Sequence, residues 1–382
     1  MRKWLVFIIT LVLIAWGGSV QAAVQGWCAE CHTMHYSQQG KQPGESGFPS
    51  TYPYNLWTGT SGPYNALLVD SCIGCHSGSS AIKGTAIPVV LHTSDPTNTG
   101  PGSTLAGGDF YWVASSGGAD DTKGHNVSGI AGQDSNIGYD PPGWDPNATS
   151  GFTWGQVASG ASNWTQQLTC AGTYGCHGDH TESTDAGAIR GAHHGDDSCL
   201  KAATLNVSAQ GSSVTTSYRF LAGIKGIEDS DWEYTATDGT TDHNQYYGVD
   251  GNSNYSNKAT ISYLCAECHG IFHKDTGSSS PWLRHPTDIT LPSTTSKEYY
   301  AYNGGSGTDN DYDILAPVGS DLSGGVEAKV TPGSSDAIVL CVSCHRAHGS
   351  EYPDLLRWCY TTCQAGTSNS NCGCFICHTQ KD

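Results

Sequence analysis

Five copies of the motif Cys-x-x-Cys-His constrain this chain more than any other feature of its sequence. Two thiols at that separation reach both vinyl groups of one porphyrin, and the adjacent histidine ligates the iron, so the motif is the attachment signature of c-type haem. Zinc knuckles and redox-active thiol pairs also use Cys-x-x-Cys, but neither requires a histidine directly after it. The five copies are Cys28/Cys31/His32, Cys72/Cys75/His76, Cys265/Cys268/His269, Cys341/Cys344/His345 and Cys374/Cys377/His378.

A sixth, irregular copy lies in the stretch LTCAGTYGCHGDH, where five residues separate Cys170 from Cys176 and His177 follows. Glycines in the spacer would let it bulge outward and bring the two thiols together. The alternative is a disulfide from one of these cysteines to Cys199, in a chain whose compartment allows oxidation. We favour a haem, because a disulfide does not explain His177 or the nearby His180.

Four further cysteines have no motif of their own, and the sequence leaves their pairing open. Cys372 adds an ambiguity about the last motif. Either Cys374 or Cys372 could pair with Cys377 before His378, and the pair with Cys372 would have a four-residue spacer. The four are Cys199, Cys359, Cys363 and Cys372.

The second axial ligand of each iron is predicted to be histidine. Met1 and Met34 are the only methionines, whereas the chain has 16 histidines. Bis-histidine iron lacks the potential-raising effect of methionine, so we expect low reduction potentials.

Several histidines stand just beyond a motif, in the form Cys-His-x-x-His or with one more residue. A histidine so close to one haem is poorly directed at the far face of that haem and better placed to ligate its neighbour. Six haems need six distal ligands, so some candidates must have another role or ligate a haem in a neighbouring subunit. His92 follows an apolar run and is interpreted as a structural histidine. The candidates are His35, His125, His180, His194, His243, His273, His285 and His348.

Residues 1–22 resemble a secretory signal peptide, with two basic residues, an apolar run and the small-residue end Val20-Gln21-Ala22. The apolar run is shorter than the ~20 residues of a transmembrane helix, and no similar run follows, so no transmembrane segment is expected. Without Arg2 and Lys3, 15 basic residues remain against 35 acidic ones. Such an acidic chain disfavours nucleic-acid binding. The signal peptide predicts an exported protein, either extracellular, at the cell surface or in the periplasm.

The composition cannot supply a conventional core, because 49 residues are glycine and polar stretches such as 100–151 and 303–321 are rich in Gly, Ser, Thr and Asn. We expect buried porphyrins to replace the missing aliphatic core, so that the chain without haem does not fold. The predicted fold is a mostly irregular, haem-organised, elongated chain with a few short helices near the motifs and short β-strands, for example over 213–221 and 337–342.

The expected organisation is a leader followed by a single multihaem unit over 23–382. Within that unit the haem motifs group toward the two ends, and the middle is wider-spaced. The segments are an N-terminal haem pair at 23–90, a glycine-rich insert at 91–165, the irregular motif at 166–200 and a three-haem region at 201–382.

The motifs resemble those of the multihaem c-type cytochromes with doubled Cys-x-x-Cys-His motifs that metal-reducing bacteria export. The stretch GWCAECHTMHYSQQG at 26–40 is similar to the start of members that polymerise into extracellular nanowires, and CVSCHRAHGSEYPDLLRW at 341–358 and CGCFICHTQKD at the end are similar to the end of related members. The resemblance implies an electron-transfer protein rather than an enzyme, with five or six haem c groups and their iron. It also implies redox partner proteins, extracellular acceptors such as Fe(III) oxides, and a homopolymer.

Two other classes remain open. A multihaem reductase of the nitrite or hydroxylamine type needs an iron with an open position, yet all five regular motifs keep their histidine. A surface adhesive protein with haems would also suit the Thr/Ser/Gly-rich inserts.

Overall fold

The computed structural model describes residues 72–83, 87–96, 104–114, 120–144, 163–189, 218–251, 257–270, 272, 285–307 and 310–381. Among these residues, no helix has the length and apolar character that crossing a bilayer requires. Several sequence predictions lie outside the described residues. They are the leader at 1–22, the first motif with Cys28, Cys31, His32 and His35, the candidate ligands His194 and His273, and Cys199 with the alternative disulfide to it.

Regular structure in the described residues consists of short pieces, which confirms the predicted fold class. The α-helices are α3 (Cys72–Cys75), α4 (Asp185–Ala188), α5 (Ile261–Ala266) and α7 (Gly373–Cys377). The 3₁₀ helices are η2 (Phe110–Trp112), η5 (Tyr218–Phe220), η6 (Glu298–Gly304), η7 (Cys341–Ser343), η8 (Pro353–Leu355) and η9 (Tyr360–Thr362). The strands are β1 (Ser77–Gly78), β2 (Ile82–Lys83), β3 (Ile87–Pro88), β4 (Leu91–His92), β5 (Thr169–Ala171), β6 (Gly175–His177), β7 (Gly226–Ile227), β8 (Gln245–Tyr247), β9 (Ile289–Thr290), β10 (Asn310–Asp311), β11 (Gly319–Ser320), β12 (Lys329–Val330) and β13 (Ile338–Val339).

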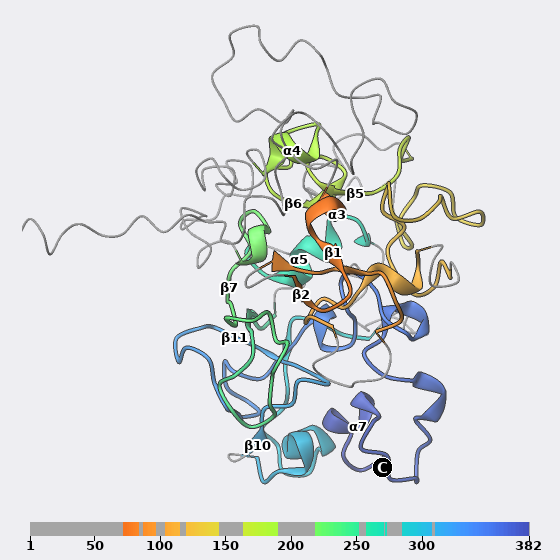
Figure 1. Cartoon of the computed structure of the whole chain (residues 1–382). Helices are drawn as coiled ribbons and strands as arrows, with labels where there is room; N and C mark the ends of the chain where they lie inside the picture. Colours follow the sequence, from red (N-terminus) through yellow and green to blue (C-terminus); the bar gives the residue numbers. More distant parts are fainter. Residues whose placement is uncertain are drawn as a thin grey trace, which may run out of the picture.

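The largest sheet has five strands in the order β7-β8-β11-β13-β9, in which β8 and β11 are parallel and the other pairs are antiparallel. The remaining strands form two-stranded pairs. In Figure 1, α3, α5 and the β5–β6 pair lie in one half of the molecule, and α7 lies in the other half near the C-terminus. One strand prediction was wrong in its described part, because residues 218–220 form η5, whereas the run at 337–342 does contain β13.

Apolar packing in the described residues is divided among small clusters. One gathers around Tyr302, Tyr312 and Trp358, a second around Tyr218 and Tyr246, and a third around Phe110, Val113 and Val127. Each of these three clusters borders cysteines of the haem motifs, which are Cys344, Cys374 and Cys377 in the first, Cys176 in the second and Cys170 in the third. Apolar side chains therefore gather where the sequence predicts porphyrin attachment.

Candidate functional site: paired histidines beside the cysteine motifs

The four regular motifs within the described residues share one backbone design. Each begins on a helical turn, in which the histidine N–H donates to the carbonyl of the first cysteine four residues earlier. Residues three apart on such a turn lie on the same side, so both thiols of a motif are presented together. The N–H to carbonyl distances are 2.8 Å for His76 and Cys72, 2.9 Å for His269 and Cys265, 3.1 Å for His345 and Cys341, and 2.8 Å for His378 and Cys374.

The irregular motif reaches the same result by a different backbone. Strands β5 and β6 pair in parallel with Thr169 opposite Gly175 and Ala171 opposite His177, which sets Cys170 opposite Cys176. The spacer turns at Gly172, whose φ of 80° suits glycine. Paired strands lie about 4.8 Å apart, close to the 5–6 Å between residues three apart on a helix. The long spacer therefore bulges outward, and the two cysteines are adjacent as in a regular motif.

The five described motif histidines have the same ring environment, with Nδ1 facing an oxygen. A carbonyl oxygen can only accept, so Nδ1 carries the proton and Nε2 keeps the lone pair that a metal requires. The acceptors are the carbonyl oxygens of Pro88 for His76 (2.8 Å), Arg219 for His177 (2.9 Å), Pro142 for His269 (2.8 Å) and Asp354 for His345 (2.7 Å), and the Glu298 carboxylate for His378 (3.1 Å).

Three of these histidines face a second histidine ring. The ring centroids are 6.3 Å apart for His177 and His348, 6.0 Å for His125 and His269, and 6.2 Å for His285 and His378. A ligating nitrogen lies about 2 Å from its metal ion and the ring centre about 1 Å further, so two rings on opposite sides of one ion have centroids roughly 6 Å apart. The pairs therefore fit a bis-histidine iron, and with the adjacent thiols they fit c-type haem.

The distal rings of two pairs are also oriented by hydrogen bonds. Nδ1 of His125 donates to the Ala347 carbonyl at 2.6 Å, and Nδ1 of His285 donates to the Pro286 carbonyl at 2.9 Å. In each case the proton is on Nδ1, which leaves Nε2 for the metal.

Burial keeps several of these rings neutral, the form in which histidine ligates a metal. Desolvation lowers the pKa of His177 to about 4 and, together with the neighbouring His177 and His125 rings, the pKa of His348 to about 3. Desolvation also lowers the pKa of His76 and His125. These four rings carry no charge at pH 7.

Two predicted ligands are placed differently. His243 is fully buried and stacks on Tyr312, and its Nδ1 and Nε2 face the carbonyl oxygens of Asn244 at 2.8 Å and Glu327 at 3.2 Å. Nε2 of His180 donates to the Cys176 carbonyl at 3.0 Å, and its Nδ1 faces the Glu267 carboxylate at 3.9 Å. Both nitrogens of His243 and the Nε2 of His180 already contact carbonyl oxygens, so we do not include His180 and His243 in the ligand set proposed below.

Cysteines of successive motifs lie near one another. The sulfur atoms of Cys72 and Cys170, with a carboxylate oxygen of Asp185, lie within 4.8 Å of one another. Burial raises the pKa of Cys268, and the nearby Cys176 raises it further. The irregular motif therefore lies near both the Cys72 motif and the Cys265 motif.

The series continues toward the C-terminus. A hydrogen bond with Cys341, with burial, raises the pKa of Cys265. Burial and the nearby Cys374 raise the pKa of Cys344 to about 12. The described sites therefore adjoin one another in sequence order.

The cysteines beyond the motifs include one disulfide, Cys363–Cys372, with a Cα–Cα distance of 5.4 Å. This bond removes Cys372 from competition for His378 and leaves the regular pair Cys374 and Cys377. Cys359 is a free thiol.

Some residues at these sites carried no sequence signal. Arg219 and Glu298 contact His177 and His378 but are separated from them by many residues along the sequence. A backbone carbonyl can accept a hydrogen bond whatever the residue type, so the sequence does not reveal such an acceptor. His92, interpreted as structural, has its Nδ1 2.6 Å from Asp109 Oδ2, and both side chains are buried. That contact is consistent with a satisfied core histidine.

Part of the chain matches a family model, and most of the chain aligns with a known protein. The doubled CXXCH motif family model matches residues 332–382, which include the last two motifs. The C-type cytochrome OmcS of Geobacter sulfurreducens is 25% identical over 363 residues, covering 87% of this chain and 78% of the relative.

Two solved structures also match the chain, each with a TM-score of 0.41. The outer membrane cytochrome S filament of Geobacter sulfurreducens is 21% identical and covers 87% of this chain and 84% of the other. The OmcS nanowire structure from the same organism is 19% identical and covers 92% and 90%.

Proposed function

We propose that this multihaem c-type cytochrome carries electrons along a series of six bis-histidine haems toward acceptors outside the cell, such as Fe(III) oxides. The observation that carries the proposal is the set of three histidine pairs with centroids 6.0 to 6.3 Å apart. Haem iron, when bound, supplies a one-electron carrier at each site. The adjacency of successive motifs supports a continuous series of such sites.

The chain's own residues hold, orient and shield the haems. The paired thiols tether each porphyrin, the Nδ1 hydrogen bonds fix the ring and raise the basicity of Nε2, and burial excludes water. His348, His125 and His285 would hold the iron together with His177, His269 and His378, respectively. For the motifs of His32, His76 and His345, we propose the remaining candidates His35, His194 and His273.

A carrier rather than an enzyme is the role that these features support, because each motif keeps its histidine and three sites already have a second ring in place. The test is the intact mass of the protein, with an electron paramagnetic resonance (EPR) spectrum of its oxidised form. We expect six haems, low-spin signals alone, and electron transfer from the reduced protein to a ferric acceptor. A high-spin haem with nitrite-dependent turnover would instead indicate a reductase, and failure to reduce the acceptor would indicate an adhesive role.

We place the protein outside the cytoplasm, at the cell surface or in the medium, with redox proteins as partners and copies of itself as neighbours in a filament. The leader supports export, and the matched solved structures are described as a filament and as nanowires. Electron microscopy of the secreted fraction tests this part. Dispersed particles at all concentrations would contradict the filament.

A further inference from the structure

Residues 219 and 220 form an unusual backbone turn that contacts the irregular motif. Arg219 and Phe220 have φ of 51° and 58°, the left-handed region that non-glycine residues avoid. The Arg219 carbonyl accepts from His177 Nδ1 at 2.9 Å, and the Phe220 carbonyl accepts from the Gly178 N–H at 2.7 Å. The strained turn therefore supports the motif histidine and the residue after it. Strain of this kind persists only where surrounding groups hold it.

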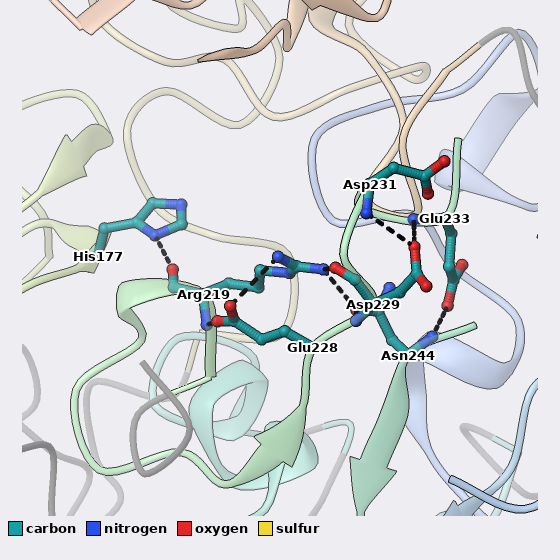
Figure 2. Close-up of polar contacts among 7 residues, drawn as sticks. All are labelled: His177, Arg219, Glu228, Asp229, Asp231, Glu233 and Asn244. Carbon is teal, nitrogen blue, oxygen red and sulfur yellow. Dashed lines mark hydrogen bonds and ion pairs between the residues drawn. The ribbon is translucent and has the colours of Figure 1, made fainter. Parts of the chain in front are cut away.

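Hydrogen bonds from Arg219 to Glu228, Asp229 and Asn244 hold the turn, as Figure 2 shows. Its backbone N–H donates to Glu228 Oε1 at 2.6 Å, and its Nη1 lies 3.4 Å from Glu228 Oε2. Its Nη2 donates to the Asp229 carbonyl at 2.8 Å and to Asn244 Oδ1 at 2.7 Å. One side chain thus ties the turn to two other segments. Glycine would adopt this backbone more easily, so the side chain is the reason for arginine here.

A second layer fixes these acceptors. Asn244 is fully buried, its Oδ1 also accepts from the Asp229 N–H at 3.0 Å, and its own N–H donates to Glu233 Oε1 at 2.9 Å. The Asp229 carboxylate accepts from the N–H groups of Asp231 and Glu233 at 3.1 and 2.9 Å. The guanidinium therefore meets acceptors that are themselves held in place (Figure 2).

We propose that Arg219 is a positioning residue for the haem of the irregular motif, acting through its own carbonyl on Nδ1 of His177. The inference rests on the proposed function, since it requires a haem at Cys170 and Cys176. The hydrogen bond sets the direction of the His177 ring, whose plane is at 41° to that of His348. It also raises the basicity of the ligating nitrogen. Without the anchored side chain, the ring turns more freely and donates more weakly to the iron.

The experiment compares Arg219→Gly and Glu228→Gln with the parent in the haem-loaded protein. Glycine removes the side chain but tolerates the backbone, and glutamine keeps an acceptor for the Arg219 N–H while weakening the ion pair. Lys329→Ala is the matched control, because it breaks an ion pair of 2.5 Å with the exposed Asp311. The readouts are haem number by intact mass, the low-spin EPR signals, and the component potentials by spectroelectrochemical titration.

We expect all variants to keep the parental haem number. In Arg219→Gly one low-spin signal changes its g values and one component shifts to higher potential, Glu228→Gln shows a smaller change in the same direction, and Lys329→Ala shows none. If Arg219→Gly does not fold, Glu228→Gln decides alone. Signals and potentials equal to the parental ones in a folded variant overturn the inference while six haems uphold the proposed function. A parental protein with five haems overturns both the role of Arg219 and the proposed haem at Cys170 and Cys176.

Discussion

Replacing Glu298 by glutamine should raise the potential of one haem. His378 is the only described motif histidine whose Nδ1 faces a carboxylate, at 3.1 Å from Glu298 Oε1. The Glu298 side chain is 12% exposed, so its charge is partly shielded from water. A negative charge stabilises ferric iron over ferrous iron, and the substitution removes that charge but keeps an oxygen that accepts from Nδ1.

The size of the effect follows from the distance. The charge lies about 7 Å from an iron held by Nε2 of His378, which at an effective dielectric constant of about 20 gives about 2.4 kcal/mol. For one electron this is about 100 mV, or roughly fifty-fold in the electron equilibrium. Partial screening by Lys381, whose Nζ is 4.0 Å from Glu298 Oε2, makes this an upper value.

Spectroelectrochemical titration of Glu298→Gln measures the shift. One component should move upward while the others stay, and Asp321→Asn, which neutralises a fully exposed carboxylate, should move none. A downward shift, or no shift in the Glu298 variant, would refute the reasoning.

Three further substitutions, one of them with a matched control variant, test stability by chemical unfolding. Cys372→Ser opens a disulfide with a sequence separation of 9 and should lower the unfolding free energy by about 2.5 to 3 kcal/mol, whereas Cys359→Ser, a free thiol, should not. Arg357→Met removes buried hydrogen bonds to two carbonyl oxygens at 2.7 and 3.1 Å and should cost about 2 to 4 kcal/mol; a loss below about 1 kcal/mol would contradict this. Burial raises the pKa of Asp313 from 3.8 in the unfolded chain to about 6 in the native state. Between these pH values the native state holds a proton that the unfolded state has released, so stability falls as the pH rises. Asp313→Asn should therefore be about 3 kcal/mol more stable than the parent at pH 7 and equal to it below pH 4, and equal stability at both pH values would count against the effect.

The sequence predicts those features of the site that depend on the spacing of neighbouring residues. Cys-x-x-Cys-His specifies a helical turn with two thiols on one side, and His125, His285 and His348 could be named as ligand candidates from the histidine supply. The facing pairs could not be predicted, because His177 and His348 meet only through the tertiary fold. His180 and His243 were candidates on the same grounds, and their nitrogens face carbonyl or carboxylate oxygens instead.

Backbone conformation explains the other differences. The run at 213–221 has strand-like residue types, but the left-handed Arg219 and Phe220 turn its described end into η5. The irregular motif needs a strand pair to bring Cys170 beside Cys176, which a spacer length alone does not specify. The glycine at the turn was the one local sign of it.

An experimental structure of the haem-loaded protein tests the central claim most directly. The account predicts an iron between the facing rings of each of the three pairs, His177 with His348, His125 with His269 and His285 with His378, and a porphyrin bonded to both Cys170 and Cys176. An iron at any of these motifs with a different distal ligand, or a Cys170–Cys176 site without porphyrin, would contradict it.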